Sequence, residues 1–169
     1  MAYTPDTPEL GIQPIAAIAA TGTVNHPLGR KVTAYDPTLG EGEFIYLYGV
    51  ASNIVGALVT YNSLTGITTL APNTAHLAQP LAVSMAANTS TTTGSWYQVY
   101  GVAVIKKTAT KVSPAVPLFL SGTAGRVFAT ATSGKQILNA VSVNAATVAS
   151  ATSTVQVNIA WPFAQGQVI

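Results

Sequence analysis

Few side chains in this sequence could take part in acid–base or nucleophilic chemistry. The 169 residues include two histidines, five carboxylates and no cysteine. Every carboxylate lies at or before Glu43, and the imidazoles of His26 and His76 are far apart in the chain. A carboxylate pair or a Ser-His-Asp triad would therefore need an acid from the first quarter of the chain, and no G-x-S-x-G motif marks a nucleophile. We expect no catalytic residues and predict that the protein is not an enzyme.

The residues that could hold a metal ion or a cofactor are equally scarce. Zinc sites use four ligands, mostly nitrogen and sulfur, which two histidines without cysteine do not supply. Calcium needs clustered carboxylates, and Asp36, Glu41 and Glu43 lack the spacing of a calcium loop. The segment GTAG at 122–125 has neither the lysine nor the helix of a phosphate-binding loop, so it reads as a turn. We expect no metal, no cofactor and no small-molecule substrate.

Charge is sparse and unevenly distributed. Only 7% of residues are charged, against about a quarter in ordinary globular proteins. The residues after Glu43 carry basic groups but no acidic side chain. A surface this poor in charge is typical of a subunit that its neighbours cover, which favours an oligomer or a part of a large assembly. The basic residues form no block and no apolar run approaches about 18 residues, so we expect neither nucleic-acid nor membrane binding.

The segment GSWYQVYGVAVIKK at 94–107 is the strongest predicted strand. Its aromatic and β-branched side chains suit a pleated, half-buried surface. Trp96 and the tyrosines are expected to fill a core, and the alternative is a platform for carbohydrate. Further strands are predicted at 43–50, 53–61, 67–70, 80–87, 116–120, 126–130, 137–144 and 155–161, the last ended by Pro162. The pattern predicts an all-β fold, either a small β-barrel or a jelly-roll-like sandwich.

The chain also resembles itself, which predicts two similar halves, 43–107 and 108–162. A shift of 58 residues places 82–84 on 140–142 and 98–99 on 156–157 with identical residues, and a shift of 59 aligns the turns that contain Gly66 and Gly125. The alternative is that a sequence rich in Ala, Thr, Ser and Val matches itself by chance. If the repeat is real, the strand 96–107 closes the first half and opens the second.

Residues 1–42 read as an extended N-terminal arm, 43–162 as the body and 163–169 as a C-terminal tail. Prolines interrupt any long helix in the arm, although 11–21 could form a short one. Its apolar residues should be buried by the body, a sister subunit or another protein. The predicted partner-binding residues are Leu10, Ile12, Ile15, Ile18, Tyr35, Lys106, Lys107 and Lys111. For the lysines the alternative is a solvated strand end.

Four segments resemble capsid decoration, or cement, proteins of tailed bacteriophages. They are HPLGRKVTAYDPTLGEGEFIYLYGVAS, GALVTYNSLTG, AQPLAVSMAAN followed by WYQVYGVAVIKK, and PLFLSGTAGRVFATAT. The resemblance implies a small all-β protein with an arm that forms a homodimer or homotrimer. It further implies binding to the outside of the virion, where such proteins clamp neighbouring major capsid protein subunits. The protein would be made in the host cytoplasm, and no individual binding residue is carried over from the family.

Two other functions fit the sequence. One is another virion part, such as a tail, head-fibre or minor capsid subunit. The other is a carbohydrate-binding β-sandwich that uses Trp96 and the tyrosines. The decoration hypothesis also predicts that removing residues 1–42 leaves a folded body with weakened capsid binding.

Overall fold

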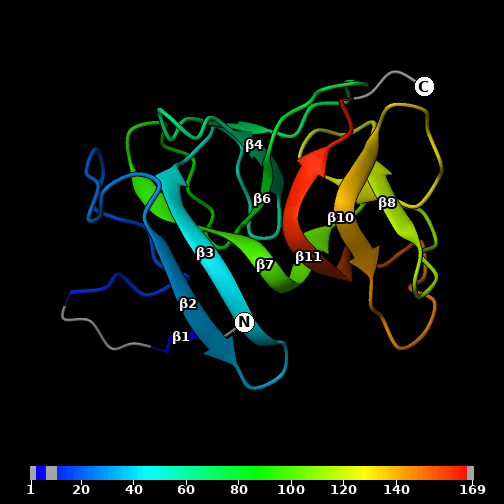
Figure 1. The fold of residues 1–169 in the computed structure, drawn as a ribbon, viewed down its shortest axis with the longest axis horizontal. Coiled ribbons are helices and arrows are strands. Elements are labelled where there is room, and N and C mark those ends of the chain that lie inside the picture. The colour runs from blue at the N-terminus through cyan, green and yellow to red at the C-terminus, as the bar shows by residue number, and fades with distance from the viewer. Residues whose placement is uncertain (1–2, 7–10, 167–169) are drawn as a thin grey trace.

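A computed structural model describes residues 3–6 and 11–166, and within these ranges it is all-β with no helix (Figure 1). The predicted fold class is confirmed. The strands are β1 (Thr4–Pro5), β2 (Lys31–Asp36), β3 (Gly40–Tyr48), β4 (Leu58–Tyr61), β5 (Thr68–Leu70), β6 (Leu81–Ser84), β7 (Gly94–Lys106), β8 (Pro117–Leu120), β9 (Val127–Phe128), β10 (Gln136–Ser142) and β11 (Thr154–Ala164). All pairings between these strands are antiparallel, in the order β1-β2-β3-β7-β11-β10-β8-β9 with β4, β5 and β6 branching from β7. The sheet does not close, so the architecture is the sandwich type and not a barrel.

Strand β7 is the longest strand and holds the molecule together. Its first part pairs with β3 on one edge and, through Tyr97 and Gln98, with β6 on the other. Its second part pairs with β11 from Tyr100 to Lys106. Gly101 lies between the two parts with a φ of +94°, next to an irregularity in the β3–β7 register. A positive φ costs a glycine little, so the bend falls where the sequence can adopt it.

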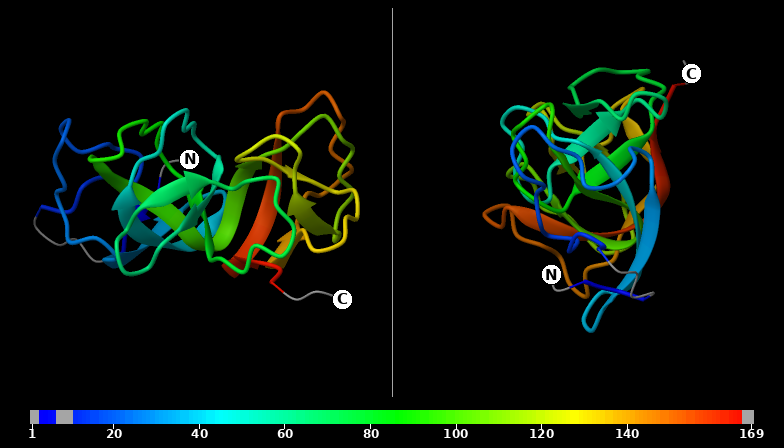
Figure 2. Two further views of the ribbon diagram at one scale, coloured as in Figure 1. Left: turned by 90° about the horizontal axis from the view of Figure 1, so that it is seen from above. Right: turned by 90° about the vertical axis from the view of Figure 1, so that its left-hand side faces the viewer.

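The strands form two units that share β7, and their pairing patterns are equivalent. The first unit contains β3, β4, β5, β6 and β7, and the second contains β7, β8, β9, β10 and β11. Four cross-strand pairs of the first unit have counterparts in the second. Between the long strands, Ile45 with Tyr97 matches Ala103 with Val157, and Val83 with Gln98 matches Val141 with Asn158. At the hairpins, Leu58 with Val83 matches Pro117 with Val141, and Thr60 with Thr69 matches Phe119 with Phe128. Figure 2 shows the two units side by side along the long axis, with β7 passing from one to the other.

The spacing between equivalent strands is not constant. It is 58 residues from β3 to β7 and from β6 to β10, 59 for the two hairpins, and 60 from β7 to β11. The predicted matches at 82–84 and at the hairpin turns are therefore structurally equivalent. Both units therefore share one pairing pattern, as the predicted repeat requires.

The apolar residues form three clusters, one of which joins the units. The first unit encloses Ile45, Leu47, Val59, Tyr61, Ala82, Tyr97 and Val99. The cluster of the second unit also includes Leu58, Leu81 and Val83 of the first. A third cluster, around Trp96, lies on the other face of β3 and β7. Since the larger core draws on both units, we expect them to fold as one body.

Residues 11–21, which we call the N-terminal segment, pack on the sheet of the same chain and do not extend away from it. The Trp96 indole is fully buried and donates its Nε1–H to the Gln13 carbonyl oxygen at 2.9 Å. The Tyr46 hydroxyl donates to the Gln13 side chain at 2.9 Å, and Ile15 is 1% exposed in the same cluster. Residues 11–21 contain turns and no helix. An indole N–H that is buried needs an acceptor, and this segment provides it.

Part of the predicted arm belongs to the sheet. Strand β2 pairs with β3 from Lys31 to Asp36, so the boundary at 42 is wrong. The intervening turn is held by Asp36, whose Oδ1 accepts the backbone N–H groups of Thr38 and Leu39 at 2.8 and 3.0 Å. The prolines of the arm had suggested irregular structure, but none falls within β2. Removal of residues 1–42 would remove the strand that pairs with β3 and would expose Trp96. The structure is therefore not consistent with the prediction that the protein stays folded without these residues.

The last strand continues past Pro162, contrary to the prediction that proline ends it. Trp161 has a φ of +53° and Asn139 in β10 has a φ of +57°, where the β10–β11 register shifts. Proline is tolerated in sheets at such irregularities. Pairing then resumes between Phe163 and Leu138, so the first residues of the predicted tail are strand.

Replacing Gly101 with alanine should sharply destabilise the protein. A Cβ at this position would lie 2.3 Å from the Glu41 carbonyl oxygen in addition to the strain of a positive φ. We expect the free energy of unfolding to fall by about 3 kcal/mol in urea titrations. Gly122→Ala is the matched control, because the nearest atom to its added Cβ is 4.0 Å away. Equal stability of the two variants would contradict the assigned role of Gly101.

Candidate interaction surface

The predicted partner-binding residues do not form one surface. Ile15 is buried against the cluster around Trp96 and Lys107 is 1% exposed, so neither is available to a partner. Leu10 lies outside the described residues. Ile12 and Lys106 are half-buried, whereas Ile18, Tyr35 and Lys111 are exposed.

Lys107 is a structural residue at the end of β7. Its Nζ donates to the Thr110 and Ala149 carbonyl oxygens at 2.8 and 3.0 Å, and to those of Thr108 and Ser150 at 3.4 Å. Burial lowers the pKa of this ammonium group. The side chain therefore ties the 108–110 loop to the 149–150 loop, which is a packing role and not a partner contact.

A groove beside the N-terminal segment brings together apolar residues from three parts of the chain. It measures about 350 Å³ and is lined by Tyr3, Pro14, Ile15, Ala16, Ile18, Val55, Met85, Ala86 and Ala87. None of these side chains is charged. Ile18, Ile54 and Val55 are 43%, 40% and 44% exposed at or next to it. We call this feature the apolar groove. Exposed apolar residues that gather in one place are typical of protein-binding surfaces.

Two sets of hydrogen bonds fix the walls of the apolar groove. The N-terminal wall is attached to the start of β7, because Ile18 forms a bridge with Ser95 and the Ala19 N–H donates to the Gly94 carbonyl oxygen at 3.1 Å. The opposite wall contains Val55, which lies two residues after Asn53 in the chain. The buried Nδ2 of Asn53 donates to the Ser84 hydroxyl at 2.8 Å and so attaches this wall to β6. The exposed side chains are therefore presented on a firmly held backbone.

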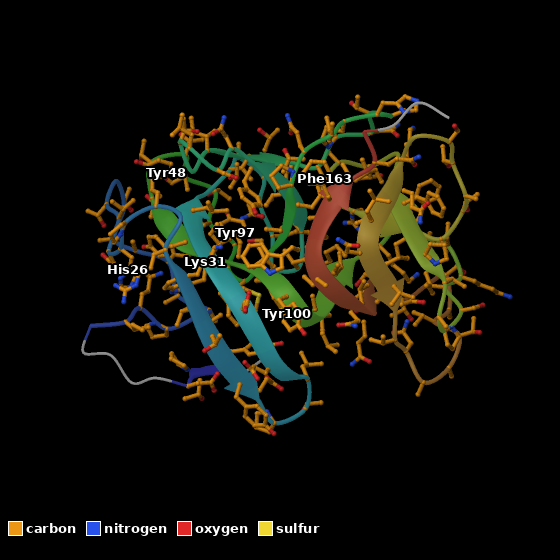
Figure 3. All side chains as sticks on the ribbon, in the orientation of Figure 1. His26, Lys31, Tyr48, Tyr97, Tyr100 and Phe163 are labelled. Atoms are coloured by element: carbon orange, nitrogen blue, oxygen red, sulfur yellow. The ribbon has the colours of Figure 1, made fainter. Side chains whose placement is uncertain are left out.

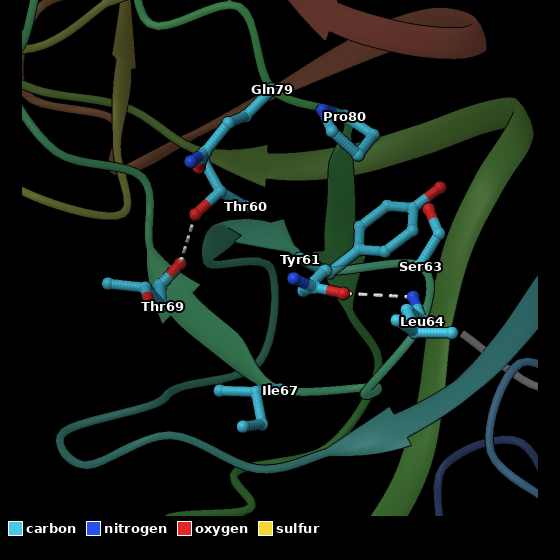
Figure 4. Close-up of a pocket in the computed structure, with 9 residues that line it drawn as sticks. Thr60, Tyr61, Ser63, Leu64, Ile67, Thr69, Gln79 and Pro80 are labelled. Atoms are coloured by element: carbon cyan, nitrogen blue, oxygen red, sulfur yellow. Dashed lines mark hydrogen bonds between the residues drawn. The ribbon is translucent and has the colours of Figure 1, made fainter.

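A second exposed apolar site lies at the β4–β5 hairpin (Figure 4). Leu64 is 93% exposed at its tip and Ile67 is 57% exposed. The turn is fixed by the Asn62 side chain, whose Oδ1 accepts the N–H groups of Leu64 and Thr65 at 2.9 and 3.1 Å. A cavity of about 500 Å³ lies between this turn and the Gln79–Pro80 segment. The geometry of the turn thus keeps the apolar Leu64 side chain in solvent, where it does not stabilise the fold by burial.

The two histidines lie in structural positions. His26 is 6% exposed, and its Nε2 accepts the Gln13 N–H at 3.0 Å. Its ring contacts those of Tyr46 and Trp96, at centroid distances of 5.1 and 5.3 Å. Figure 3 shows His26 at the end of the molecule where the N-terminal part of the chain lies. His76 has a φ of +57°, and its backbone N–H donates to the Gly134 carbonyl oxygen. Residues 3–6 and 11–166 contain no group of three or more side chains placed to hold a metal ion, and no helix that could cross a membrane.

Sequence reasoning missed most of the exposed apolar residues. Ile54 and Val55 fall in the predicted strand 53–61, but the chain enters β4 only at Leu58, after two turns. Leu64 stands in the polar turn NSLTG, and an apolar residue in such a turn was the available signal. Trp96 is completely buried, which confirms the prediction that it fills a core and rules out the alternative of a carbohydrate platform at this residue.

Comparison with known proteins does not assign the chain to a family. No protein-family model matches the sequence. No curated protein sequence matches it either.

Lys107→Met should destabilise the protein although it keeps the length of the side chain. The four carbonyl oxygens lose their shared donor, and we expect unfolding to become easier by about 2 kcal/mol in urea titrations. Lys106→Met is the control, because this neighbouring side chain is half-buried and makes no hydrogen bond in the described part of the chain. A larger loss of stability for Lys106→Met would contradict the assignment.

Stability should fall as the pH rises above about 10. Burial raises the pKa of Tyr3, Tyr46, Tyr61 and Tyr97 above the ordinary value of 10.0, so the unfolded chain loses these protons first. The loss of stability therefore grows with pH until the pKa values of the folded-state tyrosines are reached. The lowered pKa of Lys107 has the opposite effect, because it makes stability rise with pH below 10.5. Lys107 is a single group, whereas four tyrosines lower the stability, so the tyrosines should dominate.

Urea midpoints measured between about pH 8 and pH 11 would test this dependence. Tyr61→Phe should flatten the decline, since the Tyr61 hydroxyl makes no hydrogen bond with the described residues and its removal deletes one titrating group. Midpoints that stay constant or rise across this range would contradict it.

Proposed function

We propose that the protein is a structural virion component that binds the outside of a capsid and clamps neighbouring major capsid protein subunits. The all-β sandwich agrees with the fold that the resemblance to decoration proteins implies. The low charge of the chain suits a surface that neighbouring proteins cover. Such a function needs shape and buried area, and it does not need acid–base groups.

The observation that carries the proposal is the apolar groove. Its uncharged lining and the exposed Ile18, Ile54 and Val55 form the kind of centre around which protein interfaces are built. The walls are hydrogen-bonded to β6 and β7, so docking would cost little ordering entropy. We propose that a segment of the major capsid protein occupies this groove.

Self-association is the second part of the proposal, and the β4–β5 hairpin supports it. Leu64 projects fully into solvent beside a cavity of the same hairpin. In a symmetric oligomer, the Leu64 side chain of one copy would be buried against an equivalent surface of the next. A homodimer or homotrimer would then present several grooves to a capsid lattice, and linked weak contacts bind more strongly than single ones.

Aspartate at both Ile18 and Val55 should weaken capsid binding without unfolding the protein. Each new carboxylate would have to be desolvated in the interface, which we expect to weaken binding by about tenfold or more in co-sedimentation with undecorated capsids. The control carries aspartate at Leu138 and Val143, which are as exposed but lie in or next to β10 in the second unit.

The proposal requires that the control pair still binds. Unchanged co-sedimentation of the Ile18/Val55 variant would refute the role of the groove. Failure of the unmodified protein to bind capsids, combined with incorporation into tails or fibres, would instead place it in another virion part.

A further inference from the structure

Trp161 is held in a backbone conformation that bulky residues rarely adopt. Its φ is +53°, and it precedes Pro162, which restricts it further. Asn139, in the neighbouring strand β10, has a φ of +57° at the same irregularity. Strained residues of this kind tend to occur at functional sites, where a side chain must be presented in one orientation. The strained conformation does not bury the Trp161 side chain in the core, because Trp161 remains 37% exposed.

The Trp161 ring forms one wall of a cavity between β2, β3 and β11. The cavity measures about 520 Å³, and its other lining residues are Lys31, Val32, Thr33 and Glu43. The Lys31 Nζ lies 4.3 Å from the centre of the Trp161 ring. This cation–π contact holds the ammonium group over the ring that forms the wall.

A second exposed aromatic residue lies next to this cavity. Tyr100 is 45% exposed, and it is the cross-strand partner of Glu43 on one side and of Ala160 on the other. Glu43 therefore pairs with Tyr100 across the strands and shares its cavity with Trp161.

The polar groups of the cavity have unused hydrogen-bonding capacity. Within the part of the chain that the structure describes, the Glu43 carboxylate accepts no hydrogen bond and forms no ion pair. The Thr33 hydroxyl likewise has no partner among these residues, and Lys31 is engaged only with the Trp161 ring. The cavity thus offers an acceptor, a hydroxyl and a donor around an aromatic face.

We propose that this cavity binds a neutral pyranose sugar. The C–H face of a pyranose ring is apolar and can pack on the part of the Trp161 indole that remains exposed beside the Lys31 ammonium group, while its hydroxyl groups can donate to Glu43 and accept from Lys31. One carboxylate and one ammonium group leave the site without net charge, so its charges do not favour an anionic ligand over a neutral one. A purely apolar peptide segment would bury both charges without partners, which is costly.

The proposal is independent of the capsid function and of the apolar groove. It differs from the alternative of a carbohydrate platform at Trp96, because it uses the exposed Trp161 of β11. The contact area of such a site is small, so we expect weak binding.

Tryptophan fluorescence can test the site directly, because the chain has only two tryptophans and Trp96 is fully buried. The full-length protein would be titrated with neutral glucose-, galactose- and mannose-based oligosaccharides and, separately, with N-acetylated ones. We expect saturable changes in Trp161 emission with at least one series, and the two arms identify which sugar type is recognised. No saturable change with any of them would overturn the proposal.

Three variants separate binding from folding. Trp161→Gly removes the ring and relieves the positive φ, so binding should be lost while the thermal midpoint stays near that of the unmodified protein. Asn139→Gly relieves the positive φ at the neighbouring position in β10 and leaves the ring, so binding should be retained. Glu43→Ala should weaken binding at least tenfold and can be followed by Trp161 fluorescence even if Trp161→Gly is unstable. Retained affinity in Trp161→Gly or in Glu43→Ala, measured by calorimetry, would also overturn the proposal.

Discussion

The structure depends on the pairing of β7 along both of its edges. One strand of 13 residues supplies hydrogen-bonding partners to β3, β6 and β11. Since β4 and β5 attach through β6, and β10, β8 and β9 attach through β11, every strand from β2 onward is connected to it. The bend at Gly101 lets the same strand serve two units that face different ways. The repeated pairing pattern follows from this arrangement, because each unit closes against one part of β7.

The second constraint is the aromatic face that β3 and β7 present on the side away from the first unit's core. Trp96 and Tyr46 would be exposed there without the N-terminal segment, which supplies a carbonyl oxygen, a side-chain amide and Ile15 to cover them. This requirement makes the segment part of the fold. It also creates the apolar groove, because the covering segment leaves Ile18 at its edge, opposite Val55.

Much of the fold could be predicted because local patterns and tertiary structure agree. The aromatic and β-branched residues of β7 and the turns with Gly66 and Gly125 were sufficient signals. The arm was misread because its prolines and turns indicate local irregularity, while its attachment depends on a hydrogen bond from Trp96, far away in the chain. Lys107 was misread for a similar reason, since only the folded chain brings four carbonyl oxygens around it.

The candidate sites were harder to predict than the fold. A partner surface is defined by exposure, and neither Ile54 nor Val55 differs in type from a core residue. Trp161 carried a visible signal, a tryptophan directly before proline, but the natural interpretation was a strand end. Its strained backbone depends on the irregular pairing with β10, which no local pattern reveals.

Native-state hydrogen exchange of the β7 amides would measure whether the two units unfold together. If β7 joins the two units into one body, amides in its first part, paired with β3, and in its second part, paired with β11, should exchange only through global unfolding and with one common free energy. Exchange of the second part together with β8–β11 at a distinctly lower free energy than the first part would show two independent units and contradict the account.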